Sequence, residues 1–234
     1  MSGVSAARVK IGMLHTVASN AGVIGPLVAA EVAPALGLSP DDVDVLHMVD
    51  ENLLRDTIDH GLLPRTVRRV AVLAGFAEES GAQAVLVTCS SIGAAVEAAR
   101  PMVGVPVLRI DAPMASEAVR AAGAHGRIGV AATLSSTLGP TADLIRRTAA
   151  GSGGDVQVED AVADGAFAAL RAGDTAAHDR LVAQTVRDLA SRSDVVVLAQ
   201  ASMARAVSGG SEVGVPVLTS TVSGVRQLAE ALRG

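Results

Sequence analysis

The sequence predicts an α/β protein made of two similar halves, each a parallel β-sheet covered by helices. Three observations predict this class: short runs of β-branched residues alternate with alanine-rich amphipathic stretches, 50% of the 234 residues are hydrophobic, and segments of the first half recur in the second. The core must be aliphatic, because the chain has two Phe and neither Trp nor Tyr. Val, Ile, Leu and Ala are typical of parallel strands that are buried on both faces.

Each run of β-branched residues predicts one strand, and the stretches between the runs predict helices. The expected strands are 8–14, 43–49, 83–88, 105–110, 127–132, 155–159, 194–199 and 215–219. The expected helices are 21–36, 64–80, 91–100, 113–122, 138–150, 175–192, 201–207 and 222–233. Apolar residues within 64–80 recur at the i, i+3, i+4 spacing, namely Val67, Val70, Ala71, Ala74 and Ala77. This helix should therefore bury one face and leave its arginines in solvent.

Three segments of the first half are repeated in the second half, in the same order. The matched pairs are 103–108 with 213–218, 10–16 with 127–133 and 84–91 with 195–202, at offsets of 110, 117 and 111 residues. The first pair is identical, VGVPVL in both copies. Valine-rich strands resemble one another by chance, but the constant order and nearly constant offsets favour a duplicated α/β unit.

Composition argues against several classes of protein and site. A net charge of −5 and the scarcity of aromatic side chains argue against nucleic-acid binding, which needs a basic face and stacking platforms. No apolar run reaches the roughly 18 to 20 residues that span a bilayer, so we expect no membrane association. A single cysteine excludes an intrachain disulfide and fits the reducing cytosol, so we expect a cytoplasmic protein. The five histidines do not fall at metal-ligand spacing, so we expect no metal site.

The side chains best suited to chemistry stand at the ends of predicted strands. Ligands of parallel α/β units bind beyond the carboxyl ends of the strands, where helix N-termini point. Two duplicated halves that face each other would contribute equivalent residues to one cleft from opposite sides. The expected pairs are His15 and Thr16 opposite Thr133, and Cys89, Ser90 and Ser91 opposite Gln200, Ala201 and Ser202.

Cys89 follows a predicted strand and Thr88, and it opens a predicted helix. The positive end of a helix dipole lowers the pKa of a thiol and favours the thiolate. The hydroxyl groups of Ser90 and Ser91 would bind carboxylate or enolate oxygens. A small buried hydrophobe is the commonest fate of a free cysteine, and both interpretations of Cys89 remain open from the sequence.

Three other positions have two interpretations each. His15 is an acid or base of the site, or a structural histidine. Asp50 is a carboxylate of the site, or the N-cap of a helix that begins near Asn52. The hydroxyl-rich segment from Thr133 to Thr137 binds a carboxylate, or serves as a plain N-cap region.

The strand ends and the duplicated plan resemble the aspartate/glutamate racemase superfamily, which includes amino-acid and hydantoin racemases, maleate cis-trans isomerase and arylmalonate decarboxylase. The likeness covers nearly the whole chain and is most specific at 85–91 (VLVTCSS) and 196–203 (VVLAQASM). It implies two flavodoxin-like domains with parallel sheets, related by a pseudo-twofold axis, at 1–105 plus 216–234 and at 106–215. It also implies an active site in the interdomain cleft, no cofactor and a homodimer.

Racemases of this superfamily use two cysteines, one per half, as bases on opposite faces of an acidic carbon. The first matches Cys89, but the second matches Gln200, which cannot titrate. The resemblance therefore implies a racemase-like isomerase that acts on a small carboxylate or carbonyl compound. Cys89 would be its base or nucleophile, and Gln200 would donate an amide hydrogen bond.

Two alternatives to the isomerase remain open. One is a lyase or decarboxylase that protonates a carbanion from one face. The other is a ligand-binding member that has lost activity together with the second thiol. In each case the residues expected to contact the small molecule are His15, Thr16, Asp50, Thr88, Ser90, Ser91, Thr133, Thr137, Ala201 and Ser202.

Overall fold

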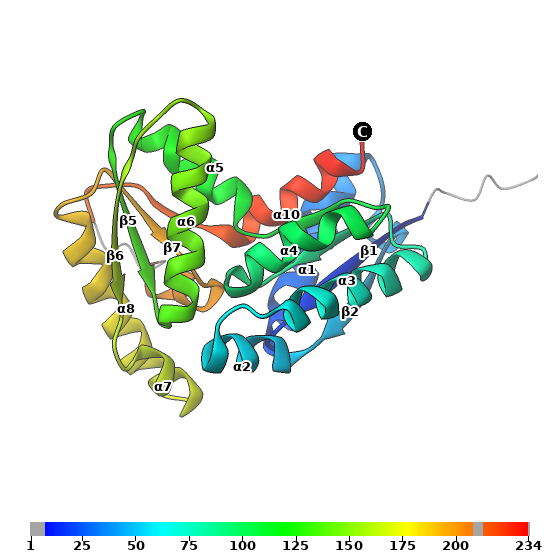
Figure 1. Cartoon of the computed structure of the whole chain (residues 1–234), viewed down its shortest axis with the longest axis horizontal. Helices are drawn as coiled ribbons and strands as arrows, with labels where there is room; N and C mark the ends of the chain where they lie inside the picture. The colour runs from blue at the N-terminus through cyan, green and yellow to red at the C-terminus, as the bar shows by residue number, and fades with distance from the viewer. Residues whose placement is uncertain (1–7, 208–212, 234) are drawn as a thin grey trace, which may run out of the picture. The chain divides into compact units, whose positions relative to one another are not determined.

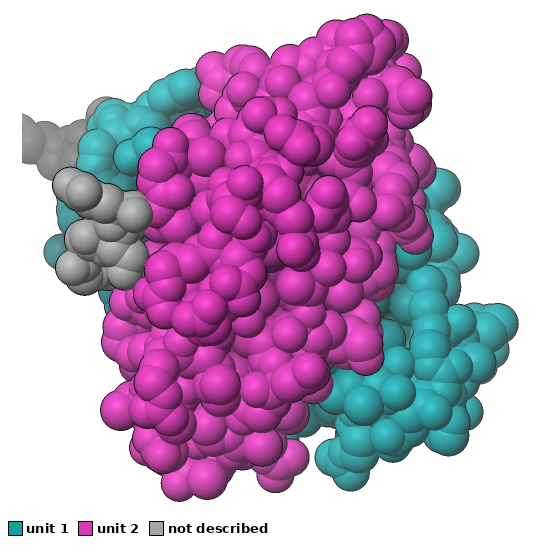
Figure 2. Space-filling view, turned by 90° about the vertical axis from the view of Figure 1, so that its left-hand side faces the viewer, with its two compact units in different colours: residues 1–110, 222–234 teal, residues 111–221 magenta. Residues whose placement is uncertain are grey.

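The chain forms two compact units, each built on one parallel sheet. The computed structural model describes residues 8–207 and 213–233. Unit 1 joins the residues up to Ile110 with those from Val222 onward, and unit 2 holds Asp111–Thr221. In the described ranges each sheet has four strands and carries helices on both faces (Figure 1). Figure 2 colours the two units teal and magenta. The predicted α/β fold class is confirmed.

Unit 1 contains a sheet with the strand order β2-β1-β3-β4. Its strands are β1 (Val9–His15), β2 (Val43–Val49), β3 (Ala84–Val87) and β4 (Val107–Arg109). Its α-helices are α1 (Ser19–Leu36), α2 (Glu51–His60), α3 (Pro64–Glu79), α4 (Gly93–Ala99) and α10 (Ser220–Ala231). Its 3₁₀ turns are η1 (Pro40–Asp42), η2 (Ser90–Ile92) and η3 (Arg100–Met102). Helices α2, α3 and α4 cover one face of the sheet, and α1 and α10 cover the other (Figure 1).

Alternation along β1 divides its side chains between the two faces of the sheet. Ile11 and Met13 pack with α1 and α10, whereas Leu14 packs with α2, α3 and α4. The predicted apolar stripe of α3 faces the sheet, with Val70 and Ala74 fully buried. The aliphatic composition therefore builds a core on both faces of one sheet.

Unit 2 contains a sheet with the strand order β6-β5-β7-β8. Its strands are β5 (Arg127–Ala132), β6 (Gln157–Val162), β7 (Val195–Leu198) and β8 (Val217–Thr219). Its helices are α5 (Ala112–Ala122), α6 (Ser135–Gly151), α7 (Ala166–Arg171), α8 (Thr175–Ala190) and α9 (Ala204–Val207), and its 3₁₀ turn is η4 (Ala201–Met203). Helices α5 and α6 cover one face, and α7, α8 and α9 cover the other.

The two sheets have the same strand order and the same register. Gly12 of β1 pairs with Val85 of β3, and Gly129 of β5 pairs with Val196 of β7. All of these pairings are parallel. The backbone pairing therefore repeats along with the sequence, as a duplicated α/β unit requires.

Replacing Gly12 with alanine should destabilise unit 1. The added Cβ would lie 2.8 Å from Cβ of Ala77 and 3.3 Å from Cγ2 of Val85, in a packed contact between strand and helix. We expect Gly12→Ala to lower the free energy of unfolding by about 1–3 kcal/mol. Gly22→Ala is the matched control, because a Cβ there meets nothing within 4 Å and alanine favours the helix. Urea unfolding measures both, and equal stability of the two variants would contradict this packing.

The predicted strands are all present, but one helix was not predicted. Each expected strand overlaps an observed one, and the main helices begin and end close to their expected bounds. The helix that one interpretation of Asp50 placed near Asn52 is present as α2, and the helix without any prediction is α7. Helix α7 has six residues, too few to display a repeating apolar stripe. Short helices therefore escape a prediction that rests on periodicity.

The chain passes between the units slightly later than the expected domain ranges place it. Those ranges were 1–105 plus 216–234 and 106–215, whereas the observed divisions follow Ile110 and Thr221. Strand β4 pairs with β3, and β8 pairs with β7. Each sheet therefore completes its fourth strand before the chain leaves the unit.

Helix α1 corrects the expectation that no segment is long and apolar enough to span a bilayer. Among the described residues this one helix, Ser19–Leu36, meets that criterion by length and composition. Ile24, Val28 and Val32 are fully buried against the sheet of unit 1. Glu31, also on α1, pairs with Arg226 of α10 at 2.7 Å. These are the contacts of a helix packed in a protein core.

Candidate functional site

The third strand of each sheet ends in the same local structure. Strand β3 is followed by Thr88, Cys89 and the 3₁₀ turn η2, and β7 is followed by Ala199, Gln200 and the 3₁₀ turn η4. Cys89 has φ −131° and ψ 115°, and Gln200 has φ −137° and ψ 140°. The thiol and the amide therefore occupy equivalent backbone positions in their own units.

Cys89 is surrounded by hydrogen-bond donors. The Thr16 hydroxyl, the Ser91 N–H and hydroxyl and the Ile92 N–H all donate to its sulfur. Its apolar side packs against the core cluster shared with α2, α3 and α4. Desolvation by this burial raises the pKa of the Cys89 thiol, and the four hydrogen bonds, which lower the pKa, do not outweigh it.

The expectation of a lowered pKa for Cys89 is therefore wrong. Cys89 opens a 3₁₀ turn of three residues rather than a long α-helix. The helix dipole acts through a continuous run of aligned peptides, so a short turn supplies little of it. The resting form of this side chain is the neutral thiol.

Alkylation should report this neutral thiol. With a raised pKa, very little thiolate exists at pH 7, so Cys89 should react with iodoacetamide more slowly than free cysteine. The alkylation rate of Cys89 should still increase at pH values where free cysteine is already fully ionised and its alkylation rate no longer changes. Mass spectrometry of timed samples measures it, since Cys89 is the single cysteine of the chain. A rate at pH 7 above that of free cysteine would contradict the neutral thiol.

Gln200 is held by Thr133, which follows β5. The Thr133 N–H donates to Gln200 Oε1 at 2.6 Å, and the Thr133 hydroxyl donates to the same oxygen at 2.9 Å. A backbone N–H must meet an oxygen, so these bonds fix which way the amide points. No described residue accepts a hydrogen bond from Gln200 Nε2. The Gln200 amide is therefore presented as a hydrogen-bond donor.

Thr133 and Thr16 have the same role in their own units. Each follows the first strand of its unit, and each donates a hydroxyl hydrogen bond to the side chain after the third strand. Thr16 donates to Cys89, and Thr133 donates to Gln200. Both donors of Thr133 hydrogen-bond to Gln200, so Thr133 positions the amide.

His15 connects the ends of β1 and β3. Its ring is fully buried, with Nδ1 3.0 Å from the Thr88 hydroxyl and Nε2 2.9 Å from Nδ1 of His47. Desolvation, and then the neighbouring His47, lower the pKa of His15 to about 4. Both ring nitrogens are engaged within the protein, so His15 is neutral at pH 7 and serves as a structural histidine.

His47 is a part of this network that the sequence analysis missed. It lies on β2, two residues before the strand end. A Cβ at Gly25 of α1 would lie 3.0 Å from His47 Cε1, so glycine makes the room for the ring. The alternation of side chains along strands could have revealed it. His47 pairs with Met13, two residues before His15, so His15 and His47 lie on the same face of the sheet.

Acidification should destabilise the protein through His15. The histidine binds its proton near pH 6.5 when unfolded and near pH 4 when folded, so the unfolded state gains protons first as pH falls. The stabilisation is complete above pH 6.5 and decreases as pH falls towards 4, by roughly 3 kcal/mol in all. Urea unfolding at pH 7 and pH 4.5 measures it. His15→Gln should flatten this dependence, and an unchanged pH dependence in that variant would contradict the assignment.

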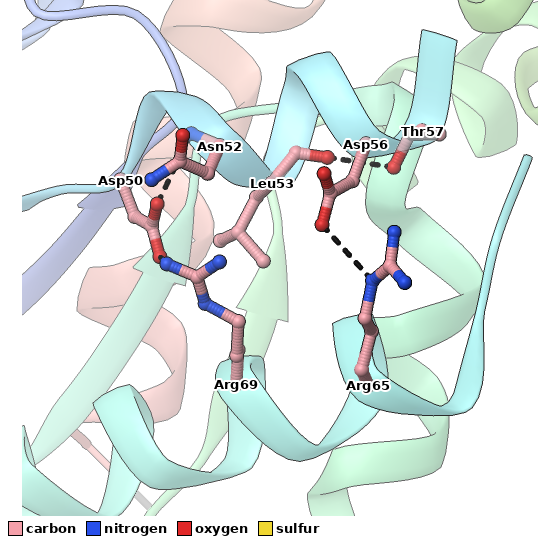
Figure 3. Close-up of polar contacts among 7 residues, drawn as sticks. All are labelled: Asp50, Asn52, Leu53, Asp56, Thr57, Arg65 and Arg69. Atoms are coloured by element: carbon pink, nitrogen blue, oxygen red, sulfur yellow. Dashed lines mark hydrogen bonds and ion pairs between the residues drawn. The ribbon is translucent and has the colours of Figure 1, made fainter. Parts of the chain in front are cut away.

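Asp50 is the N-cap of α2. Its Oδ1 accepts a hydrogen bond from the Asn52 N–H at 3.1 Å, and its Oδ2 pairs with Arg69 of α3 (Figure 3). A second ion pair, Arg65 with Asp56 at 3.1 Å, also connects α3 to α2. Of the two interpretations of Asp50, the structure therefore shows the cap, with both carboxylate oxygens in use.

The other expected site residues lie in three places. Ser90 and Ser91 are buried in η2 beside Cys89, whereas Ala201 and Ser202 are partly buried in η4 after Gln200. Thr137 is buried in the first turn of α6, where its carbonyl accepts from the Thr141 hydroxyl. Among the described residues, no three His, Cys, Asp or Glu side chains cluster as metal ligands.

Arg109 at the end of β4 was not predicted as a site residue. Its side chain is 2% exposed and pairs with Glu97 of α4. A Cβ at Gly93, the first residue of α4, would overlap the guanidinium, at 2.2 Å from Cζ. Arg109 therefore packs directly behind the turn that follows Cys89.

Comparisons with known proteins identify a family that this chain matches. The family model described as Asp/Glu/Hydantoin racemase matches residues 38–228. No curated protein sequence matches the chain.

Solved structures share the fold at low sequence identity. A candidate Asp/Glu racemase from Yersinia pestis has a TM-score of 0.72 at 14% identity, over 97% of this chain and 100% of its own. Allantoin racemase from Klebsiella pneumoniae has a TM-score of 0.64 at 18% identity, over 96% and 87%. Unliganded arylmalonate decarboxylase has a TM-score of 0.56 at 16% identity, over 97% and 93%.

Proposed function

The chain belongs to the Asp/Glu/hydantoin racemase family, and on that premise we propose that it is a cofactor-independent isomerase of a small carboxylate or carbonyl compound, with Cys89 as its one reacting thiol. The observation that carries the proposal is the pairing of strand ends. The Cys89 thiol, held by Thr16, follows β3, and the Gln200 amide, held by Thr133, follows the equivalent strand β7. We propose that both act on the same bound molecule.

The proposed chemistry uses one face of the substrate. Solvent first takes the proton of the Cys89 thiol, and the thiolate then removes the proton of an acidic carbon that lies next to a C=C bond. The C–H electron pair enters an extended enolate, and the thiol returns the proton to the far carbon on the same face, so that the double bond shifts. A raised pKa supports this role, because a more basic thiolate is a stronger acceptor for a carbon-bound proton. The donors of Thr16, Ser91 and Ile92 would stabilise the thiolate when it forms.

Gln200 would stabilise the enolate rather than exchange protons. An amide neither gains nor loses a proton near neutral pH, so it cannot replace the second base of a two-base racemase. Its Nε2 group donates hydrogen bonds, and negative charge on an enolate oxygen strengthens them in the transition state. The orientation set by Thr133 supports this assignment.

A lyase is the second candidate, and the neutral resting thiol favours it. In this reaction the C–COO⁻ bond breaks, its electron pair enters the enolate, carbon dioxide leaves, and the Cys89 S–H protonates the carbon. Water then returns the proton to the thiolate. The acid form of Cys89 is the form needed here, and it is the form that burial favours. The structural likeness to arylmalonate decarboxylase is compatible with this candidate.

A substrate screen in deuterated water tests the proposal. Small carboxylic acids with an acidic α-carbon, including substituted malonates, hydantoins and unsaturated diacids, are incubated with enzyme and followed by proton NMR. An isomerase gives a new isomer, with deuterium at one face where the thiol proton exchanges with solvent, whereas a lyase releases carbon dioxide. Saturable binding of these acids without turnover, unchanged in Cys89→Ala, would reject both enzymes and leave a binding protein.

A further inference from the structure

Arg109 is a buried positive charge at the end of β4, beside the turn that follows Cys89. Its side chain is 2% exposed, and its guanidinium pairs with Glu97 of α4. A Cβ built on Gly93, the first residue of α4, would overlap Nε, Cζ and Nη2 of the guanidinium. The guanidinium therefore fills the space that glycine leaves in the first turn of α4, and it contacts the same face of the helix again at Glu97, four residues later.

The second half of the chain has different residues at both equivalent positions. Gly93 follows the turn η2, whereas Ala204 follows the equivalent turn η4. Arg109 pairs with the last residue of β3, whereas Thr219 pairs with the last residue of β7. The six residues before Arg109 and before Thr219 are identical, VGVPVL. Glycine and arginine therefore occur together in the half that holds the thiol, and alanine and threonine occur together in the half that holds the amide.

The sheet itself does not require the arginine. Strand β8 completes the same parallel pairing with Thr219 as its last residue. Burying a guanidinium costs free energy that an ion pair recovers only in part. The arginine also depends on Gly93, because a side chain there would exclude the guanidinium. These observations connect the pair of Gly93 and Arg109 with the thiol rather than with the pairing of strands.

The backbone of Arg109 is held from α10, which covers the other face of the sheet. The Gln227 side chain donates to the Arg109 carbonyl at 2.7 Å and to the Gly224 carbonyl at 3.0 Å. The Arg109 side chain therefore extends to α4 from a fixed strand end.

We propose that Arg109 is a positioning residue for the thiol of Cys89, an inference that rests on the proposed role of Cys89 as the reacting group. The guanidinium holds the first turn of α4, and the Gly93 N–H closes the turn η2 that precedes it. The Ser91 and Ile92 N–H groups of η2 donate to the Cys89 sulfur. Such donors stabilise a thiolate more than a thiol. Arg109 thus keeps both N–H groups directed at the sulfur while it carries negative charge.

Titration of the thiol without substrate tests this role. A thiolate absorbs ultraviolet light that a thiol does not, and the chain has one cysteine and neither Trp nor Tyr, so the signal reports Cys89. In Arg109→Met the titration should shift to higher pH, and the iodoacetamide rate at pH 8 should fall about five- to tenfold. A loss of packing alone would instead expose the thiol and increase this rate.

Arg100→Met is the matched control for this substitution. The Arg100 guanidinium donates to the carbonyl of Val107, the first residue of β4, at 2.9 Å. This variant should leave both the titration and the alkylation rate of Cys89 unchanged. Because no substrate is used, the result is independent of turnover by Cys89→Ser, which tests the proposed function itself.

Two substitutions that copy the second half separate positioning from packing. Gly93→Ala alone should lower the urea midpoint by roughly 0.5 M or more, because its Cβ displaces the guanidinium. Adding Arg109→Thr removes the overlap and should recover most of this loss, since the second sheet has the same pair. Alkylation should remain about five- to tenfold slower than in the wild type.

Two results would overturn the proposal. One is a wild-type titration and alkylation rate of Cys89 in the folded double variant or in Arg109→Met, which would leave Arg109 a packing residue. The other is a double variant no more stable than Gly93→Ala, which would show that the two positions are not a pair.

Discussion

Cys89→Ser should abolish turnover of the substrate found by the screen, lowering kcat by at least about 10³-fold, while the protein stays folded. A serine hydroxyl has a far higher pKa than a thiol, so it cannot take or return the carbon-bound proton. The donors of Thr16, Ser91 and Ile92 can still hydrogen-bond to a serine oxygen, which limits the structural cost. Steady-state kinetics and urea unfolding measured on the same samples separate the two effects.

Ser80→Ala provides a control for that substitution. Ser80 ends α3, where its hydroxyl bonds the Phe76 carbonyl at 2.8 Å, away from the strand ends. It should leave kcat unchanged. Retention of more than about a tenth of the wild-type kcat by Cys89→Ser would remove the thiol from the mechanism, and the shared strand-end plan would then serve binding alone.

Gln200→Leu should lower kcat by about 10²- to 10³-fold, the usual effect of removing one donor from a site of developing negative charge. Leucine keeps the approximate volume but donates no hydrogen bond. Thr133→Val should have the same direction and a smaller effect, about tenfold, because the Thr133 N–H still holds the Gln200 oxygen after the hydroxyl is lost. The order of the two effects follows from Thr133 acting through Gln200.

Thr148→Val is the matched control for the threonine substitution. The Thr148 hydroxyl bonds the Leu144 carbonyl within α6 at 2.8 Å, and neither residue adjoins a strand end. It should leave kcat and KM unchanged. If Thr133→Val reduced turnover more than Gln200→Leu, the threonine would contact the substrate directly, and its role as a positioning residue would be wrong.

The fold could be predicted from the sequence because its strands are runs of β-branched residues buried on both faces. The repeat added the equivalence of the two halves, and with it the correspondence of Cys89 and Gln200. Helix α7 could not be predicted, because six residues do not show a period. The observed divisions between the units fall later in the chain than the expected ones. Each unit keeps its short fourth strand, β4 or β8, before the chain passes to the other unit.

The chemistry of the site was less predictable than its position. The pKa of Cys89 depends on how much water the fold removes, and a helix dipole inferred from sequence cannot be weighed against that desolvation. The donors of Thr133 are committed to Gln200, a contact between residues 67 positions apart. The role of His15 depends on His47, which only strand pairing brings within 2.9 Å. Each of these facts is a property of tertiary contacts.

Chemical cross-linking most directly tests whether the end of β3 and the end of β7 serve one ligand. The variant Gln200→Cys has two thiols, and 1,3-dibromoacetone bridges thiols only when they can approach within a few ångströms. We expect mass spectrometry to show one intramolecular bridge between Cys89 and the introduced thiol, whereas Gly139→Cys, on α6, should be modified at each thiol separately. If both thiols of Gln200→Cys react and no bridge forms, Cys89 and Gln200 do not share a substrate.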